Sequence, residues 1–193
     1  IVRSILISPW AMPVFVVALM WSWMMEPNLS PIMQFLQFIG LIEKPISVLG
    51  NPDTALFGVI IVLTWHGLPF VYLAMLAGLQ QVSDQLREAA RVDGANYWQV
   101  FRYVDLPGIR YVVTIIVILR LVWLFNHFTL IYLLTGGGPL KSTQVLSISA
   151  VEMGLDSLRY GRAATITTTM FIFLVVAFVT YYIVARRSGA ELW

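Results

Sequence analysis

Side chains able to perform covalent chemistry are few in this sequence. The 193 residues include two His and no Cys. Neither HExxH, which holds a catalytic zinc, nor the GxSxG of a serine nucleophile occurs. The sequence therefore predicts no catalytic residues and no metal site, and its polar side chains are better suited to binding than to bond breaking.

Polar and aromatic residues that could bind a solute interrupt two apolar stretches. They are Thr64, His66, Gly67, Trp123, Asn126 and His127. Amides and imidazoles hydrogen-bond hydroxyl groups and aromatic faces cover C–H surfaces, which is the chemistry that sugars require. Gly67 with Pro69 predicts a local helix break that would expose backbone carbonyls. We expect the two sets to face each other across one cavity, although each residue alone could instead hold helices together.

Two further groups of polar residues lie in these apolar stretches. Arg120 could line a solute path, pair with an acidic group on another subunit, or lie shallow enough for its guanidinium to reach water. Threonines at positions 165 and 167 to 169 are expected to hydrogen-bond carbonyls one helical turn earlier.

Membrane-spanning helices are the elements that must position all these groups. Hydrophobic residues make up 59% of the chain and charged residues 11%, against about 25% charged in ordinary soluble domains. Four stretches have the roughly 20 apolar residues needed to cross a membrane; they run near Ile5–Met25, Phe57–Ala77, Ile109–Leu134 and Ala163–Val184. Ile32–Ile42 is shorter and predicts an interfacial or re-entrant helix. The predicted fold is an all-α membrane protein, a polytopic helical bundle forming one domain over residues 1–193.

Basic residues predict the orientation of the spans. One side holds seven of the twelve, namely Arg3, Arg87, Arg91, Arg102, Arg110, Arg186 and Arg187. The other side holds four, namely Lys44, Lys141, Arg159 and Arg162, and Arg120 lies within a span. The loop at residues 79–108 is therefore predicted to be cytoplasmic. The formal net charge of +2 is too small to indicate nucleic acid.

Loop 79–108 is a polar segment between two apolar stretches, and its sequence predicts two short helices joined by a glycine hinge. Ser83 is a plausible N-cap and Gly94 suits the left-handed residue that ends a helix, so a first helix is predicted over Asp84–Asp93. A second helix follows, with an apolar stripe, and Pro107 is predicted to end it. Such a capped object suits docking to a partner.

Two plainer interpretations compete with docking. Most loops between spans only connect them. A DNA-binding helix-turn-helix also has a Gly between short helices, but the second helix here is aromatic rather than basic and both ends run into spans.

The same loop resembles the EAA signature of permease subunits of binding-protein-dependent ABC importers. That pattern is Glu-Ala-Ala, three residues, Gly, nine residues, Ile, one residue, Leu-Pro. Here it reads Glu88-Ala89-Ala90, Gly94, Val104 and Leu106-Pro107, with Val for Ile as the one departure. "SPWAMP", "NPDTALFGVIIVLTWHGLPF", "LIYLLTGGGP" and "YGRAA" look like the carbohydrate branch, of maltose and trehalose type. The resemblance covers nearly the whole chain and implies the type I importer permease fold, usually of about six spans, so one or two spans are expected before Ile1.

This resemblance implies a division of labour with ATPase subunits. The EAA loop of the family fits a cleft on the cytoplasmic ATPase, so the coupling residues would be Glu88, Ala89, Ala90, Asp93, Gly94, Leu106 and Pro107. ATP and Mg²⁺ would bind the ATPase, and this chain would bind no cofactor. Its "GGGPLKS" lacks the Gly that precedes Lys in a P-loop. The chain is thus expected to be a transporter subunit and not an enzyme.

The remaining partners also follow from the resemblance. They are a second and usually different permease chain, an extracytoplasmic solute-binding protein, a carbohydrate, and the lipid of a prokaryotic cytoplasmic membrane. In the family, positions matching His66, Gly67, Phe70 and the Asn126-His127 pair lie at the sugar site. Alternatives are an ABC permease for a polyol or a sugar phosphate and, more remotely, an ion channel or a structural membrane protein, neither of which needs an EAA loop.

Overall fold

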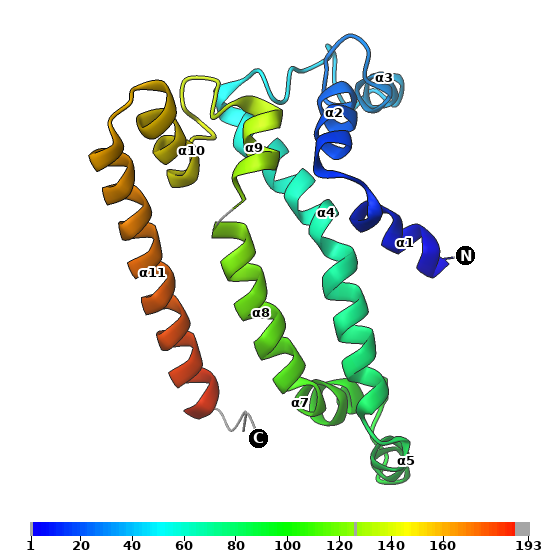
Figure 1. Cartoon of the computed structure of the whole chain (residues 1–193). Helices are drawn as coiled ribbons and strands as arrows, with labels where there is room; N and C mark the ends of the chain where they lie inside the picture. The colour runs from blue at the N-terminus through cyan, green and yellow to red at the C-terminus, as the bar shows by residue number, and fades with distance from the viewer. Residues whose placement is uncertain (1, 126, 188–193) are drawn as a thin grey trace. The chain divides into compact units, whose positions relative to one another are not determined.

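The computed structural model describes residues 2–125 and 127–187. All regular secondary structure in these residues is helical, which confirms the predicted all-α class (Figure 1). The described residues divide into two compact units. The first comprises residues 2–69, 125 and 127–171, and the second comprises residues 70–124 and 172–187.

The first unit is built around an apolar core. It contains α1 (Val2–Ala11), α2 (Val14–Met24), α3 (Pro31–Phe38), the first part of α4 (Pro52–Gln81), α9 (Phe128–Thr135), α10 (Leu146–Val151), a π-helical turn (Glu152–Asp156) and the start of α11 (Tyr160–Arg187). Val17, Val62 and Leu130 have no exposed surface and bring α2, α4 and α9 together. Trp21 and Trp65 pack against this core edge to face, with ring centroids 5.5 Å apart, an arrangement that aromatic rings prefer.

The second unit carries loop 79–108. It contains the rest of α4, α5 (Asp84–Val92), α6 (Tyr97–Val100), a π-helical turn (Phe101–Asp105), α7 (Leu106–Gly108), α8 (Arg110–Phe125) and the later part of α11. α4 and α8 pack closely at Gly78, where a Cβ would lie 3.0 Å from the Val112 side chain. Ile109, at the corner between α7 and α8, is fully buried. These contacts fix the loop at one end of α4 and α8.

The predicted spans are only partly straight helices. Among the described residues, α4 and α11 are long and apolar enough to cross a membrane unbroken. Two pairs qualify only if bent: Ile5–Ala11 with Val14–Met24 at 113°, and Tyr97–Gly108 with Arg110–Phe125 at 66°. The predicted span Ile5–Met25 therefore consists of two helices rather than one straight helix. Pro13 explains the break, because it lacks an N–H and its ring clashes with the preceding turn.

The interruption expected near the solute residues lies at a different place in the chain. α4 continues from Pro52 to Gln81, so the predicted break at Gly67 and Pro69 is wrong. Both residues are buried, and a membrane helix tolerates one missing donor when its neighbours hold the turn. The predicted third span is the one that breaks: α8 ends at Phe125, His127 is non-helical, and α9 begins at Phe128.

The predicted short apolar helix at Ile32–Ile42 corresponds to α3. The Ser30 hydroxyl accepts a hydrogen bond from the N–H of Met33 at 3.1 Å and so caps the helix. Phe35 and Phe38 are exposed on it. Eight residues extend about 12 Å, too short to span a membrane.

The hydroxyl groups of α11 behave as predicted at three positions. Thr165, Thr167 and Thr169 each donate to the carbonyl four residues earlier, at 2.8 to 3.0 Å. Arg120 is half-buried on α8, which leaves its three predicted alternatives open.

Candidate functional site

The first helix of loop 79–108 forms as predicted, within one residue. α5 runs from Asp84 to Val92, with Ser83 at the N-cap position, although its side chain makes no capping hydrogen bond. Gly94 ends the helix with a φ of +85°. The N–H of Ala95 reaches back to the carbonyl of Ala90 at 2.9 Å, the six-to-one bond of a Schellman turn.

The second helical segment of the loop is capped by a feature that sequence reasoning missed. The Asn96 side chain accepts from the N–H of Gln99 at 3.0 Å, and the Gln99 side chain accepts from the N–H of Asn96 at 2.7 Å. The Asn-x-x-Gln spacing of this capping box was a usable signal. The segment ends at Gly108, one residue after the predicted stop at Pro107.

Arg87 ties the loop to the end of a span. Its Nε donates to Asp105 Oδ1 and its Nη1 to Asp84 Oδ1, both at 2.7 Å. Nη2 donates to the carbonyl of Leu79 at 2.8 Å, and Nη1 to that of Val82 at 3.3 Å. Carbonyls at a helix C-terminus have no partner within the helix, so a guanidinium is a suitable donor there. One side chain thus connects α4, α5 and the segment that leads into α8.

The surroundings of Arg87 keep it charged. The hydrogen bond that Arg87 donates to Asp105, followed by the one it donates to Asp84, raises the pKa of Arg87 above its ordinary value. The side chains of Arg87 and Asp105 are only 21% and 16% exposed. Sequence reasoning missed this pair because Asp105 fills the position that the EAA pattern leaves free. The signal available was opposite charges at the two ends of one short helical hairpin.

The motif residues of the loop face outward. No residue of α5 is buried. The exposed motif residues are Glu88, Ala89, Asp93, Gly94, Leu106 and Pro107, and Ala90 is half-buried. A helix that is capped, tied from behind and lined with small side chains can enter a cleft on another protein without rearranging.

His66 has a structural partner that the sequence did not indicate. Its Nδ1 lies 3.1 Å from the carbonyl oxygen of Pro9. Because a carbonyl only accepts, Nδ1 carries the proton and Nε2 is left as an acceptor. In a regular helix the carbonyl of Pro9 would accept from the N–H of residue 13, but Pro13 has no N–H. The backbone N–H of Met12 lies a long 3.4 Å from the Pro9 oxygen, so His66 supplies the shorter hydrogen bond.

The other predicted solute residues are distributed over both units. Phe70 and Trp123 form an aromatic pair in the second unit, with ring centroids 4.7 Å apart. Thr64 is exposed on α4, and His127 is half-buried between α8 and α9. Asn126 lies outside the described residues. The structure therefore pairs Phe70 with Trp123, and the single shared cavity remains a prediction.

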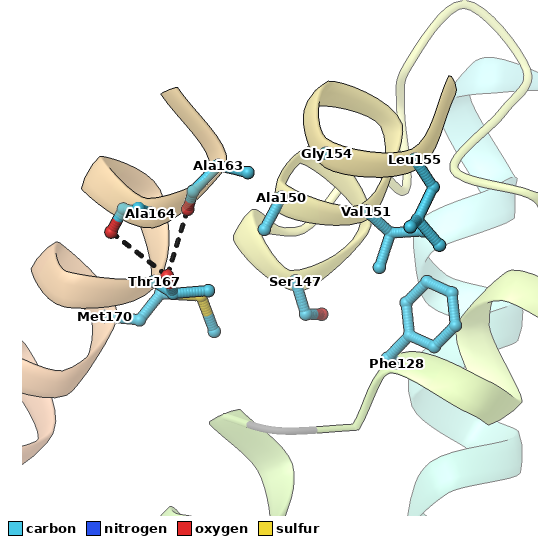
Figure 2. Close-up of a pocket in the computed structure, with 10 residues that line it drawn as sticks. All are labelled: Phe128, Ser147, Ala150, Val151, Gly154, Leu155, Ala163, Ala164, Thr167 and Met170. Atoms are coloured by element: carbon cyan, nitrogen blue, oxygen red, sulfur yellow. Dashed lines mark hydrogen bonds between the residues drawn. The ribbon is translucent and has the colours of Figure 1, made fainter. Parts of the chain in front are cut away.

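A separate cavity of about 480 Å³ lies in the first unit between α9, α10 and α11 (Figure 2). Its lining is mainly apolar and consists of Phe128, Ser147, Ala150, Val151, Gly154, Leu155, Ala163, Ala164, Thr167 and Met170. The Ser147 hydroxyl is buried there with no hydrogen-bond partner. Of the predicted solute residues that the structure describes, none lines it. Within the described part of the chain, no three His, Asp or Glu side chains converge as a metal site would require.

Apolar spans with an outward-facing capped loop at one end define a polytopic α-helical membrane protein built to engage a partner. Residues 1–189 match the family of binding-protein-dependent transport system inner membrane components. The chain belongs to this family, which confirms the resemblance seen in its EAA loop. It is a multi-pass inner membrane protein of a transport family and not a member of an enzyme family.

Several similar proteins are named for the transport of carbohydrates. The chain is 33% identical to the trehalose/maltose transport system permease protein MalF of Thermococcus litoralis, over 97% of this chain and 62% of that protein. It is 30% identical to the diacetylchitobiose uptake system permease protein DasB of Streptomyces coelicolor, over 97% and 58%. The crystal structure of a bacterial ABC transporter that imports alginate contains a similar chain, with a TM-score of 0.86 and 25% identity over 96% of this chain and 65% of that one. This chain thus spans less than two thirds of the length of these relatives.

Proposed function

We propose that this chain is the membrane-embedded part of a permease subunit in an ATP-driven ABC importer of sugars or oligosaccharides. Family membership supports the importer role, and the names of the similar proteins support the solute class. The observation that carries the proposal is the geometry of α5, which exposes Glu88 and Ala89 yet is tied by Arg87 to the end of α4 and to Asp105. That arrangement can transmit movement of a docked ATPase to the spans.

Within this proposal, each part of the loop has one role. Glu88 makes the ionic contact with the ATPase, while Ala89 and Ala90 allow close approach. Gly94 forms the bend, and Leu106 with Pro107 sets where the loop meets α8. ATP and Mg²⁺ bind the partner ATPase and not this chain. A second permease and an extracytoplasmic solute-binding protein complete the complex.

The solute is proposed to meet side chains from α4 and from the break between α8 and α9. The Phe70–Trp123 pair offers aromatic surface for sugar C–H groups. The Nε2 of His66 can accept a hydrogen bond from a sugar hydroxyl, because Nδ1 is already engaged with Pro9. His127 lies where helical structure stops, a position at which transporters often bind solutes, and Asn126 precedes it in the sequence.

The test is uptake of labelled solute by the full-length permease, reconstituted with its ATPase, second permease and binding protein in proteoliposomes. ATP-dependent uptake of a maltose-type or chitobiose-type sugar, but not of a polyol or a sugar phosphate, supports the proposal. Glu88→Lys should reduce uptake strongly, while the matched variant Glu43→Lys, at an exposed position remote in sequence from the loop, should not. Wild-type uptake by Glu88→Lys would show that the loop does not couple.

A further inference from the structure

The segment that follows the Gly94 turn has an exposed aromatic face. This elbow segment (Tyr97–Gly108) comprises α6, the π-helical turn and α7. Trp98 is 73% exposed and Tyr103 is 70% exposed, whereas Val100 is buried. Trp98, Arg102 and Leu106 follow one another on successive turns and are all exposed. Trp98 packs edge to face on Tyr97 and Phe101 of the same segment, while Arg87 and the capping box tie the loop together.

The geometry places this face at the end of a span. The elbow segment is bent by 66° from α8, which begins at Arg110 after a single intervening residue. Ile109, at the corner, is fully buried, and Gly108 packs so closely on Val82 that a Cβ would lie 2.8 Å from its side chain. The elbow segment therefore lies across the end of α8, and Figure 1 shows α7 at that end with α5 beyond it. Where an apolar span stops, the membrane surface begins.

The residue types on this face match a lipid headgroup layer better than water or a protein cleft. Trp and Tyr concentrate at membrane interfaces, because their rings are apolar at one end and polar at the other. Arg102 adds positive charge, which favours anionic headgroups. The acidic side chain of the segment, Asp105, is turned inward onto Arg87, so it does not oppose this attraction. α5 differs, because it carries exposed acidic residues and no aromatic ring.

We propose that the elbow segment lies in the headgroup layer of the leaflet at this end of α8, with Trp98, Tyr103 and Leu106 facing lipid and Arg102 facing anionic headgroups. α5 then projects beyond this layer, free to meet its partner. The elbow is a support resting on the membrane surface, and α5 is the part that engages the ATPase. The proposal requires only that α8 enters the membrane from its Arg110 end, so it is independent of the solute.

The test uses a spin label on single cysteines of the full-length permease in nanodiscs that contain anionic lipid, first without the ATPase. These 193 residues contain no Cys, so each introduced thiol is unique within them. Labels replace Trp98, Gln85 on α5, and Val176 on α11, all at exposed positions. Collision with oxygen reports lipid, and collision with a water-soluble nickel complex reports water. We expect the ratio of oxygen to nickel collisions at 98 to be several-fold above that at 85 and below that at 176.

Three results would overturn the proposal. The label at 98 could be as accessible to nickel as the label at 85, which would place the face in water. It could lose nickel accessibility only after the ATPase is added, which would make it a docking surface. It could be shielded from both probes without the ATPase, which would mean a protein contact. If Trp98→Cys does not insert, Tyr103→Cys gives the same measurement, and a nickel-accessible label at 176 would identify failure of the span assignment instead.

Discussion

Replacing Gly94 should weaken ATPase binding by a calculable amount. Gly94 has a φ of +85°, and a Cβ built on it would meet no atom within 4 Å. Steric contact with neighbours therefore contributes nothing, and the cost of Gly94→Ala is the conformational strain of a left-handed non-glycine residue, about 1–2 kcal/mol. No residue of α5 is buried, so little packing opposes a shift to other loop conformations. If those conformations cannot dock, the apparent Kd should rise by up to about 5- to 30-fold.

Binding of the purified ATPase to the nanodisc-embedded permease measures this effect, with solute uptake as a second readout. Gly94→Asn is the first control, because Asn tolerates positive φ better than Ala and should lose less affinity. Gly161→Ala is the matched control, since Gly161 lies in α11, also with open space around its Cβ, but without a positive φ. Equal affinity for Gly94→Ala and Gly161→Ala would refute the idea that the left-handed turn presents α5.

Three other predictions follow from the same geometry. Arg87→Ala should lower the amount of solute imported per ATP hydrolysed, whereas Arg91→Ala, an exposed cation on the same helix, should not; equal ratios would show that the Arg87 ties do not carry coupling. Cysteines at Gln85 and Lys44, both exposed, should react with an impermeant reagent from opposite sides of the membrane, and labelling of both from outside would contradict the orientation inferred from basic residues. His66→Ala should lower the free energy of unfolding by about 1 kcal/mol through loss of its bond to the Pro9 carbonyl, and an unchanged thermal midpoint would contradict that bond.

Local signals in the sequence predicted the loop well. The turn at Gly94 and the extent of α5 depend on residues within one or two helical turns, so composition and spacing are sufficient. The all-α class could also be predicted from the sequence, because it follows from hydropathy and from the need of a membrane-embedded backbone to satisfy its own hydrogen bonds.

Local sequence signals could not predict the long-range contacts, or which prolines break a helix. Arg87 and Asp105 are 18 positions apart and meet only after the Gly94 turn has folded, and several other charges were available to each. Pro13 breaks a helix and Pro69 does not, although both lie in apolar stretches. Pro13 follows Pro9 by one turn, so two donors are missing close together, while Pro69 is buried among neighbours that hold α4. Position in the packed structure, and not residue type, decides between these outcomes.

The ties around Arg87 have a consequence for how the complex responds to ionic strength. Screening acts over about 10 Å at 0.1 M salt and 3 Å at 1 M, and it weakens exposed charges more than shielded ones. The contact of Arg87 with Asp105 is short and largely shielded, whereas Glu88 on α5 is exposed. Concentrated salt should therefore release a docked ATPase while the loop keeps its shape, and dilution should restore the complex. The assembly could then be taken apart and rebuilt in the membrane without unfolding the permease.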